Sequence, residues 1–300
     1  MKKLLIILAV IFLYACVKLT SGKRFQNDYI VMSGNIFAGE YITLKEPIFI
    51  GKTIDVNDIN IVDLFVYNAK VYILDKENKN RQDLIFGAEI DENIFNVGYY
   101  DPTESFMIES GRTYLLVAIV GQDSVWAETT VPDPFSILEN EGFTDDKNSD
   151  FPEIVHSRID DLYPIKLKVS DQDEKAVYIE YYCLEDWENA FYILSDYLGE
   201  KPQSALEYEN TMSGSPRKNT SLNIYLPKED QTIETINNQF HFIFYGSYKV
   251  SVHIVDDNFL KYRYKSMGYF HGGINNGIGF FGSMSRKLLY TNINPSPSAE

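Results

Sequence analysis

Short runs of β-type residues, separated by turn residues, recur along the chain from residue 29 onward, and no other feature limits its fold as strongly. The clearest run is 240–255, where seven large side chains fall on even positions: Phe240, Phe242, Phe244, Tyr248, Val250, Val252 and Ile254. A period of two places such side chains on one face of a strand. Gly246 and Ser247 near the middle predict a hairpin, which would set His241 opposite His253 on the other face.

The first half of the chain predicts a β-sandwich. Residues 113–120 are almost all apolar, as expected of a central strand buried on both sides, and a turn at 121–123 leads to a return strand. Pro47 predicts an edge strand or a bulge, because proline cannot donate to a sheet ladder. The remaining strands of this half are expected at 29–36, 41–50, 61–74 and 84–90. Strands at this spacing are typical of a sandwich.

Pro132 and Pro134 end this series of strands and mark a domain boundary. The sequence therefore predicts a mainly β fold with two β-sandwich-like domains, the second β-rich with one or two short helices. The predicted organisation is a signal peptide at 1–15, a tether at 16–27, an N-terminal domain at 28–132, a linker and mobile loop at 133–162, and a C-terminal domain at 163–300.

Two segments of the second domain are candidate helices. Apolar residues within 185–198 lie near helical spacing and Gly199 suits a helix end, although a pair of strands also fits. Asp256, Asp257 and Asn258 are suitable caps for a short helix through Leu260.

The first sixteen residues predict export and anchoring. Lys2 and Lys3 precede the apolar run 4–13, which is shorter than the about 20 residues that span a membrane. The segment 13–16, Leu-Tyr-Ala-Cys, resembles a bacterial lipobox, although Tyr14 stands where a small residue is usual. The resemblance implies cleavage before Cys16 and acylation of that cysteine. The alternative is an uncleaved signal anchor in which Cys16 is one apolar residue of a membrane helix.

Charge and cysteine content exclude several classes of partner and bond. The formal net charge of −16 disfavours binding to nucleic acid and to anionic lipid. The chain has two cysteines, so a lipidated Cys16 leaves Cys183 no partner for an intrachain disulfide. Cys183 lies in the apolar run 177–184 and is predicted to be a buried thiol.

Five segments together resemble the domain-of-unknown-function 4249 family, uncharacterised lipoproteins of Bacteroidota. They are an opening strand followed by glycine, a "G-x-x-Y-x-L" strand, the close of the first domain, a polar turn that opens the second, and a terminal glycine-rich signature. These segments are 29–36, 110–117, 127–132, 169–178 and 274–282, the last being the most specific.

This resemblance implies a first domain like the immunoglobulin-type regulatory modules of carboxypeptidases, followed by a second β-rich domain. It implies attachment to the outer membrane, with the periplasmic or extracellular face left open. Association with a TonB-dependent receptor, and hence an accessory role in uptake, is also implied. It supplies no catalytic residues and no cofactor.

Motifs for catalysis or metal binding are weak. The glycine-rich segment 272–279 lacks the lysine of a phosphate-binding loop and predicts a tight turn, with Phe280 and Phe281 in the core. His241 and His253 would form half of a transition-metal site, but no third ligand follows at a fixed spacing. The acidic segments 145–150 and 171–174 lack the glycine and glutamate of an EF-hand; a loose calcium site at the second competes with an Asx-turn.

The sequence therefore favours a non-enzymatic, lipid-anchored accessory or ligand-binding protein, with Cys16 as its lipid attachment site. An alternative is an independent glycan- or peptide-binding module using Trp126, Trp187 or Tyr269. A second alternative is a hydrolase whose site the sequence does not display, because fold alone does not decide function.

Overall fold

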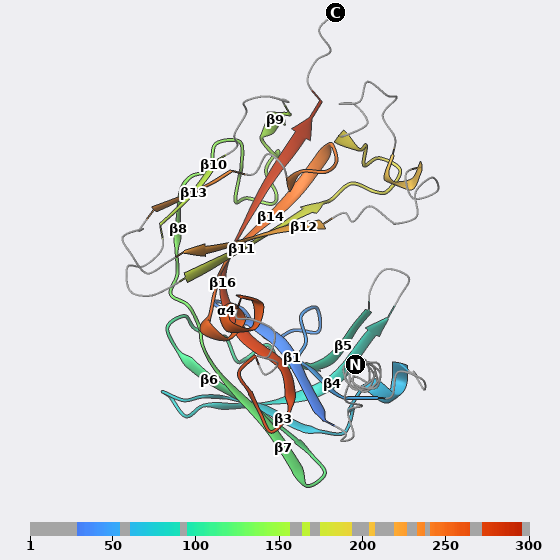
Figure 1. Cartoon of the computed structure of the whole chain (residues 1–300), viewed down its shortest axis with the longest axis vertical. Coiled ribbons are helices and arrows are strands. Elements are labelled where there is room, and N and C mark those ends of the chain that lie inside the picture. The colour runs from blue at the N-terminus through green and yellow to red at the C-terminus, as the bar shows by residue number, and fades with distance from the viewer. Residues whose placement is uncertain are drawn as a thin grey trace, which may run out of the picture.

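The computed structural model describes residues 29–54, 61–90, 95–156, 164–168, 175–193, 204–207, 219–226, 233–237, 241–264 and 272–295. The chain is mainly β with few short helices, as the sequence predicted. In the described ranges the strands form sheets of seven, six and three strands, arranged as two lobes (Figure 1). The predicted signal peptide, the predicted tether 16–27 with Cys16, the acidic segment 171–174 and Tyr269 lie outside these ranges.

The first lobe is a sandwich. One layer is the six-stranded sheet, whose members are, in spatial order, β15 (Ile274–Asn275), β7 (Asp123–Thr130), β6 (Thr113–Val120), β3 (Lys70–Asp75), β4 (Arg81–Ile90) and β5 (Phe95–Tyr100). The facing layer contains β1 (Ile30–Phe37), β2 (Phe49–Lys52) and the first half of β16 (Ile278–Asn294). A short 3₁₀ helix, η1 (Ile61–Leu64), follows β2. Their core includes Met32, Ile73, Leu116 and Phe281; burying each such side chain stabilises the fold by about 1.5–3 kcal/mol.

The second lobe is built on the rest of the seven-stranded sheet. Its strands are β12 (Asn219–Leu226), β11 (Lys175–Cys183), β14 (Gly246–Val255), the second half of β16, and β9 (Glu153–Val155). The small sheet consists of β13 (Ile233–Asn237), β10 (Pro164–Lys168) and β8 (Ser136–Glu139). Ile165 and Phe135 pack in one core with Val177, Val252 and Leu289 of the large sheet.

Strand β16 runs through both lobes (Figure 1). Its first half pairs in parallel with β1, from Val31↔Ile278 to Phe37↔Met284, and its second half pairs with β14. This corrects the predicted domain 163–300, because Ile274 and Phe281 belong to the core of the first lobe. The segment 133–162, predicted as a linker and mobile loop, contributes β8 and β9.

Several strand predictions are confirmed by the pairing. Strand β6 lies between β7 and β3, and a hairpin joins it to β7. Strand β2, which follows Pro47, is an edge strand of its sheet. The glycine-rich segment turns between β15 and β16. A side chain at Gly279, the second residue of β16, would overlap the carbonyl oxygen of Met32 on β1. Phe281 is fully buried in the core and Phe280 packs against α4 (Asp257–Tyr264).

The predicted hairpin at Gly246 and Ser247 is wrong. Strand β14 begins at Gly246 and continues without a turn to Val255. Phe242 and Phe244 reach the same core from an irregular segment, where the Tyr248 hydroxyl donates to the Phe244 carbonyl and accepts from its N–H. Local periodicity could not distinguish this arrangement, since the same residues face the core in either case.

The two helix predictions have different outcomes. Helix α4 follows Asp256, whose carboxylate accepts a hydrogen bond of 2.9 Å from the Phe259 N–H as an N-cap. Within 185–193 there is instead a turn, and Phe191 and Tyr192 form isolated β-bridges; the remainder of that candidate helix is not described. No helix in the described ranges is long and apolar enough to cross a membrane.

Candidate ligand pocket at the junction of the lobes

A pocket of about 500 Å³ lies where the two lobes meet, on the side of the seven-stranded sheet away from both cores. Strands β1, β2, β11, β14 and β16, the loop between β1 and β2, and α4 contribute its walls. The lining residues are Ser33, Gly34, Asn35, Phe37, Glu46, Pro47, Phe49, Tyr178, Glu180, His253, Phe259, Arg263, Met284 and Arg286. Its volume lies within the range of about 300–1,000 Å³ typical of small-molecule sites.

Strand alternation explains why these side chains converge. On β1, Met32 and Ile36 enter the core while Asn35 and Phe37 line the pocket. On β14, Val252 enters the core of the second lobe and the next residue faces the pocket. A period of two thus divides each strand between a core and the pocket.

His253 is the most unusual residue of the pocket. It is 2% exposed, and neither ring nitrogen has a hydrogen-bond partner among the described residues. The Glu180 carboxylate lies 3.8 Å from its Nε2, beyond hydrogen-bond distance. Burial, reinforced by the charges of Arg286 and Lys249, lowers the pKa of His253 to about 3. The ring is therefore neutral and offers one donor and one acceptor.

Arg286 holds the loop between β1 and β2 against the sheet. Its Nε and Nη2 both donate to the Glu40 carboxylate, its Nη1 donates to Glu46 at 2.7 Å, and its guanidinium lies 4.2 Å from the ring centre of Phe37. Two carboxylates thus neutralise this cation and occupy three of its nitrogens. We infer that Arg286 shapes the pocket wall rather than attracting an anion.

Tyr178 and Glu180 form the opposite wall, on β11. The Tyr178 hydroxyl donates to Glu180 at 2.7 Å, and burial together with this bond raises the pKa of Tyr178 to about 12. Across the pocket, Oδ1 of Asn35 is buried and has no hydrogen-bond partner within the described part of the chain. The pocket is therefore lined by aromatic rings and by residues whose buried polar atoms have no hydrogen-bond partner within the described part of the chain.

The histidine pair predicted from the sequence does not form. His241 stacks on Tyr181 on the core side of β11, with 5.0 Å between ring centres, whereas His253 lies on the other side of the sheet. Burial lowers the pKa of His241. Within the described ranges no group of three His, Cys, Asp or Glu side chains is arranged to hold a metal ion.

The other sequence candidates lie away from the pocket. Trp126 is on β7 in the first lobe and Trp187 follows β11 in the second, and neither residue lines the pocket. In the acidic segment 145–150, Asp146 accepts a hydrogen bond from the Asn148 N–H, as in an Asx-turn. Cys183 is buried, as predicted.

Sequence reasoning did not identify Asn35, Tyr178, Glu180 or Arg286. One available signal was the position of His253 on the polar side of an apolar alternation. Polar residues on buried strands are common, however, so this signal did not indicate which of them converge.

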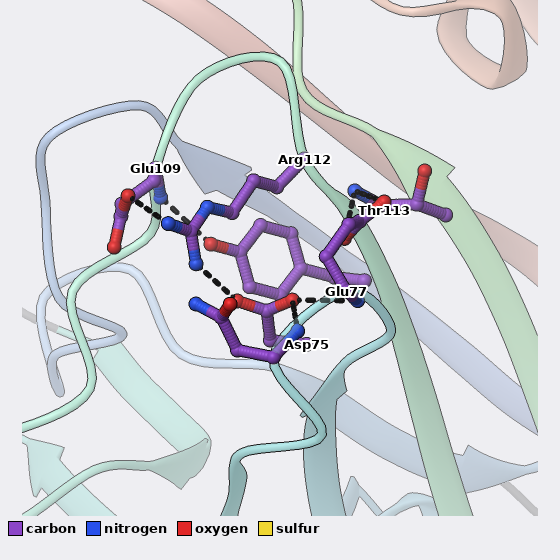
Figure 2. A network of polar contacts seen from close by, with 7 residues as sticks. Asp75, Glu77, Glu109, Arg112 and Thr113 are labelled. Carbon is purple, nitrogen blue, oxygen red and sulfur yellow. Dashed lines mark hydrogen bonds and ion pairs between the residues drawn. The ribbon is translucent and has the colours of Figure 1, made fainter.

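A second polar cluster, shown in Figure 2, is structural rather than a binding site. Arg112 bridges Asp75 and Glu109, with 2.6 Å to each carboxylate, and Asp75 also accepts from the Glu77 N–H. Glu77 in turn accepts from the Thr113 N–H at 3.1 Å. Burial alone would raise the pKa of Asp75, but backbone hydrogen bonds and Arg112 lower it below its ordinary value. These contacts join the β3–β4 turn to the start of β6.

No protein-family model matches the chain, and the search of curated proteins found no match.

Proposed function

We propose that this protein is a non-enzymatic lipoprotein, anchored in the outer membrane through Cys16, that binds a small ligand in the junction pocket. By its resemblance to the domain-of-unknown-function 4249 family, it serves a TonB-dependent uptake system as an accessory component. The observation that carries the binding role is His253, a neutral, buried ring that faces a pocket with both nitrogens unpaired among the described residues. A buried polar group without a partner costs about 1–3 kcal/mol, and a ligand that reaches the ring nitrogens recovers this free energy.

Capture of ligands from an envelope extract tests the binding role. The full-length protein, purified in detergent, is incubated with the extract, and bound compounds are identified by mass spectrometry. We expect at least one compound on the wild type that is lost on His253→Phe, which keeps an aromatic ring but removes both nitrogens. His241→Phe is the matched control, because His241 lies outside the pocket.

Asn35→Leu supplies a second pocket variant from a different strand, so that misfolding of one variant does not decide the result. If folded wild type and both folded pocket variants retain the same compounds, the binding role is wrong. The receptor association is tested separately by crosslinking in native membranes; recovery of no outer-membrane barrel would contradict it.

A further inference from the structure

We infer that the ligand of the junction pocket is a neutral, hydroxyl-rich ring, such as one or two units of a carbohydrate. This inference rests on the proposed binding role and names the chemical class of the ligand. The strand pattern of the sequence does not indicate this class of ligand. The polar and aromatic groups that the fold brings together indicate it.

The first argument is the balance of charge in the pocket. Arg286 is paired with Glu40 and Glu46, Glu180 accepts the Tyr178 hydroxyl on the opposite wall, and Arg263 of α4 adds a second cation to the lining on that side. With cations and carboxylates on both sides of the cavity, a ligand of either sign meets repulsion as well as attraction. A neutral molecule avoids the desolvation cost of a buried charge.

The second argument is the kind of hydrogen bond that the pocket offers. Among the described residues, the unpaired buried atoms are Oδ1 of Asn35, an acceptor, and the two nitrogens of His253, one donor and one acceptor. The Glu180 carboxylate adds further acceptor capacity. A hydroxyl group both donates and accepts, so adjacent hydroxyls on one ring can satisfy this mixture.

The third argument is the aromatic content of the walls. The rings of Phe37 and Tyr178 flank His253, with centres 6.1 and 5.6 Å from its own, and Phe259 lies beside Tyr178 at 5.6 Å. Aromatic faces carry negative charge density, and the C–H groups on one face of a sugar ring carry partial positive charge. The combination favours a molecule with apolar faces and a hydroxylated edge.

Calorimetric titration of the full-length protein tests this class directly. The probes are methyl glycosides of neutral hexoses and the matching disaccharides, with a uronic acid and an amino sugar as charged counterparts. We expect binding of at least one neutral glycoside and weaker binding of both charged counterparts.

Two pocket variants and one control assign the contacts. His253→Asn should weaken binding about tenfold or more, since the shorter amide does not reach the position of Nε2 and one buried hydrogen bond is lost. Glu180→Gln should change affinity by less than about threefold, because the amide keeps a hydrogen-bonding oxygen and removes only the charge. His241→Asn should leave affinity unchanged. A ligand whose affinity falls about tenfold with Glu180→Gln and does not change with His253→Asn would be cationic. Such a result would overturn the inference.

The outcomes distinguish a wrong ligand class from a wrong binding role. If the extract yields a compound that depends on His253 or Asn35 and no glycoside binds, the ligand class is wrong and the binding role stands. If no compound of any class depends on either residue, both the ligand class and the binding role are wrong.

Discussion

The hydroxyl of Thr129 on β7 donates a hydrogen bond to the buried carboxylate of Asp256, which caps α4 127 positions later in the chain. Ser283 of β16 lies 2.6 Å from the same Thr129 hydroxyl. Asn258 donates to the backbone carbonyls of Glu128 and Phe281, at 2.6 and 2.8 Å. These bonds fasten the start of α4 to the first lobe and so fix one wall of the junction pocket.

Asp256 should make stability depend on pH between about 4 and 6. Burial raises the pKa of Asp256 to about 6, so the folded chain binds its proton before the unfolded chain does. Protonated Asp256 contributes about 2–3 kcal/mol to the free energy of unfolding below about pH 4. This contribution is lost as the pH rises through 6. Urea unfolding at a series of pH values measures the free energy of unfolding of the wild type and of Asp256→Asn. The difference between the two proteins should change by this amount between pH 4 and 6; a difference independent of pH would contradict the prediction.

His253 should have the opposite effect on stability. Because burial holds its folded pKa near 3, the unfolded chain takes up the proton first as pH falls below about 6.5. Between pH 6.5 and 3 the free energy of unfolding of the wild type should therefore fall by about 3–5 kcal/mol more than that of His253→Asn. The measurement is the same series of unfolding curves. Equal acid sensitivity in the two proteins would show that protonation of His253 does not oppose folding.

Loss of Arg286 should destabilise the fold more than loss of an exposed arginine. Arg286→Met leaves Glu40 and Glu46 without their cation, and we expect a cost of about 1–3 kcal/mol in free energy of unfolding. Arg81→Met is the control, because the Arg81–Asp83 pair is largely exposed and should contribute less than about 1 kcal/mol. Comparable costs for the two variants would refute the structural role of Arg286.

Gly279 should not tolerate a side chain. Its φ is +125°, and an added Cβ would meet the Met32 carbonyl of the adjoining strand. We expect Gly279→Ala to lower the free energy of unfolding by about 2 kcal/mol or more, through strain and a shifted backbone. Gly121→Ala, at φ +63° with no neighbouring atom within 4 Å, should cost only about 1 kcal/mol. Urea denaturation of both variants measures the difference.

Replacing Cys16 tests the proposed lipid anchor. Cys16→Ser should release the protein from the membrane fraction or leave an uncleaved precursor, since serine cannot carry the thioether-linked lipid. Fractionation and incorporation of a labelled fatty acid report the result, with Cys183→Ser as the control. Unchanged fractionation of a mature, labelled Cys16→Ser protein would remove the basis of the lipoprotein proposal.

Much of the local structure followed from the sequence because its causes are local. Apolar alternation predicted β14 and the side on which His253 lies, and the run at 113–120 predicted a central strand. Asp256 predicted the start of α4, since its carboxylate has only to reach the next turn. The glycines of 272–279 predicted a tight turn, which lies between β15 and β16.

Tertiary structure alone decided which strands became neighbours. Arg286 and Glu40 are 246 positions apart, and no local pattern indicates that β16 lies beside β1 and then continues into the second lobe. Period-two alternation states which side of a strand is apolar but not which strand it joins. The pocket arises because several polar faces, each unremarkable in its own strand, meet where one strand passes between two cores.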